Sequence, residues 1–232
     1  MLIIGHRGAA DLAPENSLEA FERGVEAGAD LLEFDVQLTR DGVPVVIHDS
    51  TLLRTHKSKA KVKKSDHKSL QDAAAKGHRI ATLEEVLDLY FGKILLNLEI
   101  KNRGTATAIT NFIKDRYIKK PDDWHYILFS SFKVSELFAV RHITEEAPLG
   151  LLHNRNPFTF IAYQRRLQLS AVGFHRLYVN PLATEIATKL NLFIYAYTVN
   201  RPGAAHLLEK QGINGIVTDN PEKMYRGAPG RD

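Results

Sequence analysis

One short segment reads Leu31-Leu32-Glu33-Phe34-Asp35-Val36-Gln37 and alternates apolar with polar side chains. Successive side chains of a β-strand point to opposite faces of its sheet. Leu32, Phe34 and Val36 therefore share one face, and Glu33, Asp35 and Gln37 share the other. The alternation predicts a strand that has one side in a hydrophobic layer and carries two carboxylates on its other side.

A second segment, Leu96-Asn97-Leu98-Glu99-Ile100-Lys101, repeats this alternation. If both strands belong to a closed sheet with helices outside, the apolar faces pack under the helices and the polar faces point inward. Glu33, Asp35 and Glu99 then converge in an interior of low dielectric constant. The alternative, two exposed edge strands with polar outer faces, stays open here, although a closed barrel has no edges.

Strand-like and helix-like segments alternate along the rest of the chain. The predicted strands are Leu2–Gly5, Leu31–Leu38, Ile94–Ile100, Tyr126–Phe129, Pro148–Leu152, Ala171–Phe174, Leu192–Val199 and Gly215–Val217. The predicted helices are Ser17–Ala27, Thr82–Leu89, Thr107–Tyr117, Lys133–His142, Phe158–Leu169, Pro181–Leu190, Pro202–Gln211 and Pro221–Tyr225. This alternation predicts an α/β fold with a parallel sheet, and eight strands are the number that closes into a (β/α)8 TIM barrel. An open doubly wound sheet is the competing architecture, but no G-x-G-x-x-G motif follows the first strand.

The chain of 232 residues is long enough to bury a full hydrophobic core. No linker or change of composition divides it, so we expect one catalytic domain at residues 1–226 and a flexible tail at residues 227–232. Asp49–Ile80 is the one long stretch that reads as irregular, and a loop of that length is usually functional or mobile.

The composition is ordinary for a soluble protein, with 44% hydrophobic and 25% charged residues and a formal net charge of +4. Lysines concentrate at residues 56–68, which suits a solvated loop or a contact with an anionic surface, and the role of this loop stays open. No aromatic residue lies among these lysines, so base stacking is not indicated and we expect no nucleic-acid partner.

The sequence contains no cysteine, which excludes disulfides, thiolate metal sites and a cysteine nucleophile. The first residues turn polar too soon for a signal peptide, and no apolar run approaches the roughly 20 residues that cross a bilayer. We therefore expect a cytoplasmic protein without a transmembrane segment. The sequence does not indicate an oligomeric state.

Two of the ten histidines follow strand-like segments, the end at which barrel active sites are built. His6 follows the first strand, and His48 follows the apolar run at residues 43–47. Histidine titrates near neutral pH, as general acid–base catalysis requires. Arg7 offers a fork that matches two phosphate oxygens, although a surface role is an equal alternative. Glu15 suits either a supporting role at the site or the start of a helix.

The inward carboxylates need a compensating charge, and oxygen ligands suit Mg²⁺ or Ca²⁺ best, with Mn²⁺ as a further candidate. At this point the residues resemble a known family. Its motifs occur in order as His6-Arg7-Gly8, Pro14-Glu15-Asn16-Ser17, Glu33-Phe34-Asp35-Val36, Asp41-Gly42-Val43-Pro44-Val45, His48-Asp49, Leu98-Glu99-Ile100-Lys101, Tyr197-Thr198-Val199-Asn200 and Gly215-Ile216-Val217-Thr218-Asp219-Asn220-Pro221. Together they resemble the glycerophosphodiester phosphodiesterase family over nearly the whole chain.

The resemblance implies a (β/α)8 barrel of the phospholipase C-like phosphodiesterase type with one bound divalent cation. It assigns Glu33, Asp35 and Glu99 to the cation. The same resemblance assigns His6 and His48 to acid–base catalysis. It assigns Arg7 and Lys101 to binding of the phosphate. One departure is Tyr197, which stands where the family commonly has Trp near the organic end of the substrate, so the preferred alcohol stays open.

The implied reaction is metal-dependent hydrolysis of a small glycerophosphodiester to glycerol 3-phosphate and an alcohol. The resemblance also implies that the glycerol 2-hydroxyl attacks first and that water opens a cyclic phosphate. Neither histidine is singled out as the base. A lysophospholipase D-type phosphodiesterase and a catalytically silent barrel that binds phosphate esters are the alternatives.

Overall fold

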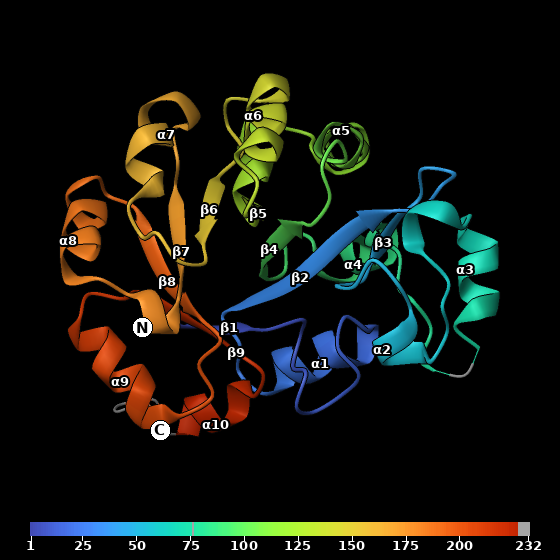
Figure 1. The fold of residues 1–232 in the computed structure, drawn as a ribbon, viewed down its shortest axis with the longest axis horizontal. Helices are drawn as coiled ribbons and strands as arrows, with labels where there is room; N and C mark the ends of the chain where they lie inside the picture. Colours follow the sequence, from blue (N-terminus) through green and yellow to red (C-terminus); the bar gives the residue numbers. More distant parts are fainter. Residues whose placement is uncertain (76, 227–232) are drawn as a thin grey trace.

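The computed structural model describes residues 1–75 and 77–226. Within these residues one nine-stranded sheet forms, and all of its strands except β3 run parallel, which leaves eight in the barrel (Figure 1). The barrel strands are β1 (Leu2–Gly5), β2 (Leu31–Leu38), β4 (Leu95–Ile100), β5 (Ile127–Ser131), β6 (Leu149–His153), β7 (Ala171–His175), β8 (Phe193–Tyr197) and β9 (Gly215–Thr218). Pairing of β1 with both β9 and β2 closes the sheet, so the predicted barrel is confirmed. The expected flexible tail at residues 227–232 lies outside the described residues.

Helices follow the strands and cover the outside of the barrel (Figure 1). They are α1 (Leu18–Glu26), α4 (Leu83–Tyr90), α5 (Ala106–Tyr117), α6 (Val134–Ile143), α7 (Thr159–Leu167), α8 (Pro181–Lys189), α9 (Pro202–Lys210) and α10 (Pro221–Arg226), with short 3-10 turns at Pro121–Tyr126 and Arg176–Tyr178. Two predicted helix starts are present: Ser17 caps α1, and Thr82 forms a capping box with Glu85. No helix in the described part of the chain is both long and apolar enough to span a membrane.

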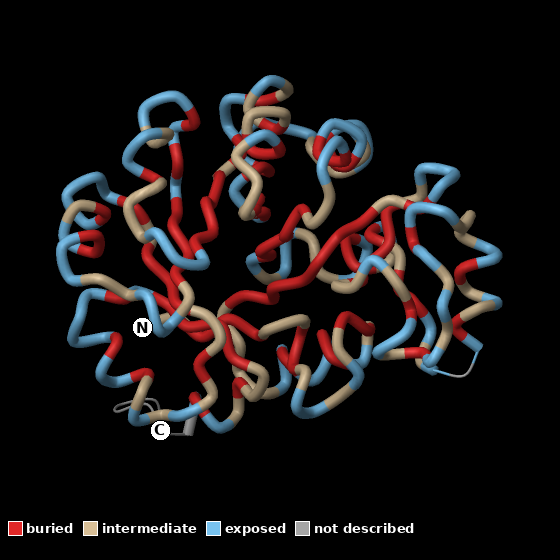
Figure 2. The backbone as a smooth tube through the Cα atoms, in the orientation of Figure 1, coloured by how far each residue is buried: buried red, intermediate tan, exposed pale blue. Residues whose placement is uncertain are grey.

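The strands form the buried centre of the molecule (Figure 2). On β2 the apolar residues Leu32, Phe34 and Val36 are fully buried and belong to the main hydrophobic cluster under the helices. Parallel pairing of β2 with β4 sets Asp35 opposite Glu99. The polar faces of these two strands therefore meet inside the barrel, as the alternation predicts.

The segment Asp49–Ile80 is not irregular, and this expectation was wrong. It contains α2 (Leu53–His56), a 3-10 turn η1 (Val62–Lys64) and α3 (His67–Ala73), which lie at one side of the barrel (Figure 1). Apolar residues of the segment pack against Val45 and Ile47 in a separate small hydrophobic cluster, which contains Leu52, Val62, Leu70, Ala74 and Ile80. These apolar residues are spaced among lysines, so no strong helical period marks the sequence.

The strand before His48 also differs from the expectation. β3 (Pro44–Val46) is no barrel strand, because it pairs antiparallel with the end of β2. The chain therefore turns back beside β2, and the backbone N–H of Ile47 donates to the carbonyl of Asp35. His48 reaches the level of the carboxylates by this hairpin, not by ending a barrel strand.

Glu136 on α6 holds the start of α5. Its carboxylate is buried and accepts the backbone N–H groups of Gly104, Thr105 and Ala106 at 2.9, 3.1 and 3.1 Å. Substitution Glu136→Gln removes the charge and part of the acceptor capacity, so we expect the free energy of unfolding to fall by about 1–3 kcal/mol. Thermal melting measures this loss, and Glu145→Gln on an exposed loop is the control. Equal melting temperatures for the two variants would contradict the assignment.

Candidate active site

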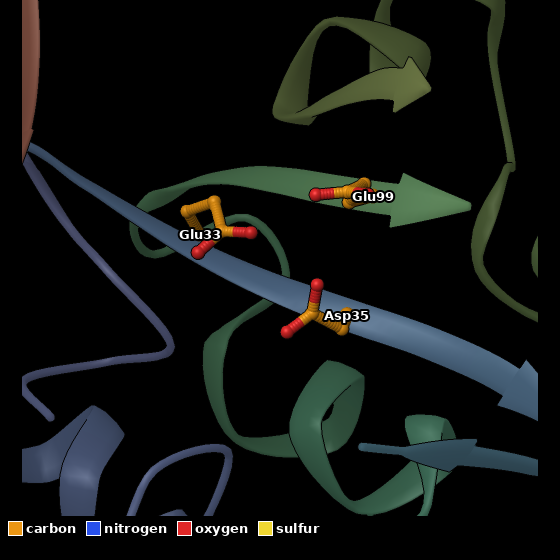
Figure 3. Close-up of side chains that lie close together, drawn as sticks. All are labelled: Glu33, Asp35 and Glu99. Carbon is orange, nitrogen blue, oxygen red and sulfur yellow. The ribbon is translucent and has the colours of Figure 1, made fainter. Parts of the chain in front are cut away.

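Three carboxylates meet inside the barrel (Figure 3). Ligand oxygens of Glu33, Asp35 and Glu99 lie within 4.8 Å of one another, and all three residues are buried. Glu33 and Asp35 project from one face of β2, and Glu99 projects from the neighbouring position on β4. The convergence expected from the alternation of the two strands is present in the structure.

Burial and mutual repulsion change the pKa values of the three carboxylates. Burial, with the charge of Asp35 added, raises the pKa of Glu99 to about 8 and also raises the pKa of Glu33. Burial acts in the same direction on Asp35, but Lys101 and Arg7 outweigh it and lower the pKa of Asp35 to about 2. The Nζ atom of Lys101 lies 2.7 Å from Glu99 Oε1 and 3.3 Å from Asp35 Oδ1.

This donor set fits a hard divalent cation. Every ligand is an oxygen, which Mg²⁺, Ca²⁺ and Mn²⁺ prefer over nitrogen or sulfur. The raised pKa values of Glu33 and Glu99 mean that the protein's own positive charges do not compensate the ionised cluster. A bound cation would supply that compensation, because it favours the ionised form of each carboxylate.

His6 follows β1 and is held by a carboxylate from the adjacent strand. Its Nδ1 atom lies 2.5 Å from Oδ1 of Asp219, which follows β9, and Asn200 donates to the other oxygen of Asp219. Burial opposes the charged imidazole, but the Asp219 hydrogen bond and the charge of Glu33 prevail, so the pKa of His6 is raised. Fixing Nδ1 leaves Nε2 as the ring atom for proton transfer.

His48 has a matching arrangement on the other side of the site. Its Nδ1 atom lies 2.7 Å from Oδ1 of Asp49. The buried amide of Gln37 on β2 donates to the carbonyls of residues 47, 48 and 49 at 3.0, 2.8 and 2.9 Å and so holds this turn. Burial lowers the pKa of His48, and the charge of Asp35 and the hydrogen bond with Asp49 do not fully offset it. The pKa values of His6 and His48 are therefore shifted in opposite directions.

Arg7 joins the carboxylates to the first barrel loop. Its φ of 51° lies in the left-handed region, a conformation that non-glycine residues rarely adopt, and its backbone N–H donates to Glu33 at 2.9 Å. The guanidinium contacts Glu15 Oε1 at 2.7 Å and Asp35 Oδ2 at 3.4 Å. Glu15 in turn accepts from Arg54 on α2. Of the two roles that the sequence leaves open for Glu15, these contacts favour the supporting one.

Tyr197 ends β8 beside Phe132, with ring centroids 5.9 Å apart. Its hydroxyl donates to the backbone carbonyl of His153 at 2.6 Å, so this proton is already used within the protein. A cavity of about 40 Å³ lies here. It is lined by His6, Glu33, Asn97, Glu99, Ser130, Phe132, Leu152, Tyr195, Tyr197 and Val217.

A protein-family model described as the glycerophosphoryl diester phosphodiesterase family matches residues 6–223. The chain belongs to this family. Its sequence is 34% identical to a glycerophosphodiester phosphodiesterase of Caldanaerobacter subterraneus subsp. tengcongensis, over 96% of each chain. The predicted family, and with it the enzyme class, is confirmed.

Solved structures of the family superimpose on this barrel. A phosphodiesterase of Oleispira antarctica, solved with the product sn-glycerol-3-phosphate, has a TM-score of 0.86 at 26% identity and covers 98% of this chain and 96% of its own. The glycerophosphodiester phosphodiesterase of Thermotoga maritima has a TM-score of 0.81 at 26% identity, with 96% of both chains covered. The fold of this member is therefore the fold of its relatives.

In the folded chain all the site residues predicted from the sequence lie in one region. Further residues, which had no predicted role, contact them there. Asp219 and Asp49 belong to motifs of the sequence that predict no partner for them, and Gln37 lies on the predicted inward face without a predicted role. Arg54 was not singled out. Asp219, Asp49 and Gln37 each form a hydrogen bond with a predicted histidine, and Arg54 donates to Glu15.

Proposed function

We propose that this enzyme hydrolyses glycerophosphodiesters to glycerol 3-phosphate and an alcohol, and that it depends on one divalent cation held by Glu33, Asp35 and Glu99. The observation that carries the proposal is the buried carboxylate cluster, whose oxygens lie within 4.8 Å of one another in a chain of this family. A bound cation would act as a Lewis acid and would offset charge on the phosphate oxygens.

Residues of the chain would bind the phosphate and transfer the protons. Arg7 and Lys101, which border the cluster, would hold the phosphate and stabilise its growing charge. His48, whose pKa is lowered, suits the base that takes a proton from the attacking hydroxyl. His6, whose pKa is raised, suits the acid that protonates the leaving alkoxide.

The substrate is proposed to be a small molecule. The glycerol 3-phosphate product is supported by the Oleispira antarctica relative, which was solved with that product. Phe132 and Tyr197 form an aromatic wall beside the carboxylates, where the organic group of a diester could pack.

Product analysis with purified protein tests this function. We expect glycerophosphocholine, supplied with Mg²⁺, Ca²⁺ or Mn²⁺, to yield glycerol 3-phosphate and choline. A parallel assay with lysophosphatidylcholine separates the lysophospholipase D-type alternative, which predicts faster turnover of the lipid. Binding of phosphate esters without turnover of either substrate would identify a catalytically silent barrel.

A further inference from the structure

The guanidinium of Arg54 on α2 forms hydrogen bonds with two carboxylates. Its Nη1 and Nη2 atoms donate to the two carboxylate oxygens of Glu15 at 2.6 and 2.5 Å. Its Nε atom donates to Oδ2 of Asp49 at 2.8 Å. One side chain therefore joins the loop after β1 to the turn after β3.

Both partners of Arg54 are bound to other groups of the site. Glu15 Oε1 also accepts from Arg7, and Asp49 Oδ1 contacts the Nδ1 atom of His48 at 2.7 Å. A continuous series of hydrogen bonds thus runs from the arginine beside the carboxylates, through Arg54, to the histidine on the other side. A shift of Arg54 would change the position of both ends.

Helix α2 gives this bridge a fixed support. Leu52, directly before the helix, is fully buried in the small hydrophobic cluster of the 49–80 segment, together with Val62 and Leu70. The His56 ring at the end of α2 is buried as well, and its Nε2 atom lies 2.8 Å from the carbonyl of His78. Arg54 itself is half-exposed, so its contacts add little to stability by themselves.

We propose that Arg54 is a positioning residue that holds Arg7 and His48 in one arrangement through Glu15 and Asp49. The 49–80 segment supports the active site because it contains Arg54. The effect on turnover rests on the function proposed above. The planar guanidinium is essential, because it pairs with both oxygens of Glu15 and donates from Nε to Asp49 in one fixed geometry, and a lysine ammonium has no such fixed arrangement of donors.

Kinetics of Arg54→Gln, Arg54→Lys and Arg40→Gln test the proposal. Arg40 lies near the same segment and pairs with Asp66 at 2.6 Å, away from both histidines, which makes it the matched control. We expect both Arg54 variants to lose about 10- to 100-fold in kcat with a smaller rise in KM, because small misplacements of reacting groups cost that much. Their Tm should fall by no more than about 4 °C. Arg40→Gln should keep the wild-type kcat.

A double-mutant comparison separates positioning from general damage. If Arg54 acts through Asp49, Arg54→Gln should cost much less kcat in an Asp49→Asn background than in the wild type. Full additivity, a wild-type kcat for Arg54→Lys, or a kcat within two-fold of wild type for Arg54→Gln would overturn the proposal.

A measurement without substrate distinguishes failure of this proposal from failure of the proposed function. Ring ¹⁵N signals of His48 and His6 are recorded by NMR in Mg²⁺-supplied protein, with assignments from histidine-to-glutamine variants. We expect Arg54→Gln to shift the His48 signals more than those of His6, because Arg54 is joined to His48 through Asp49 alone. Unmoved His48 signals would refute the bridge even in an active enzyme. Shifted signals in a protein that hydrolyses no diester would support the bridge and refute the function.

Discussion

Substitution His48→Ala should lower kcat for glycerophosphocholine by about 10²- to 10⁴-fold with saturating cation, the usual contribution of a general acid or base. The ring is placed by Asp49 and by the turn that Gln37 holds, and its lowered pKa keeps it neutral and able to accept a proton at neutral pH. Removing the ring leaves the carboxylates and the phosphate-holding groups in place. The loss should therefore appear mainly in kcat.

Steady-state kinetics at several cation concentrations check this result. His206→Ala on α9 is the matched control, because that histidine is half-exposed and lies on the outer layer of the barrel. The control should keep its turnover. If His48→Ala turns over at nearly the wild-type rate with cation present, the acid–base mechanism is wrong.

Substitution Glu99→Gln should abolish cation-stimulated turnover and at the same time stabilise the metal-free protein. The pKa of Glu99 is raised to about 8 from its ordinary value of 4.5, first by burial and then by Asp35. At neutral pH the folded protein must therefore keep a proton that the unfolded chain releases. Replacing this group by a neutral amide of the same shape removes a penalty on the order of 1–3 kcal/mol.

The sign of the pH dependence follows from the same shift. Between pH 4.5 and about 8 the folded state binds more protons at Glu99 than the unfolded state does, so its contribution to stability is lost as pH rises. The Tm advantage of the metal-free Glu99→Gln variant should widen from pH 5 to pH 8. In the wild type, cation binding requires the ionised carboxylates, so the cation-induced rise in Tm should grow with pH.

Thermal melting with chelator and with added cation measures both effects. Glu185→Gln, which removes an exposed ion pair with Lys189 on α8, serves as the control and should behave like the wild type. A Glu99→Gln variant that gains as much Tm from the cation as the wild type does would show that this carboxylate is not a ligand.

The barrel and its inward carboxylates could be predicted because a strand has a fixed two-residue period. In β2 and β4 the apolar positions had to face the helices, so Glu33, Asp35 and Glu99 had to face the interior. The family motifs then ordered the remaining candidates. None of this required knowledge of how distant parts of the chain pack.

The missed features depend on that packing. β3 is three residues long and runs antiparallel, and α2 spans four residues, so neither has a periodic signal in the sequence. Asp219 lies 213 residues from His6, and Arg54 lies 39 residues from Glu15. Local spacing cannot pair such residues, because the barrel closure and the hydrophobic cluster of the 49–80 segment bring them together.

The most direct test is the effect of a chelator on glycerophosphocholine turnover by the purified protein, followed by separate addition of Mg²⁺, Ca²⁺ and Mn²⁺. A cation held by Glu33, Asp35 and Glu99 predicts that turnover disappears with the chelator and returns with at least one ion, and that Asp35→Asn fails to recover under the same conditions. Undiminished turnover by protein shown to contain no metal would contradict the account.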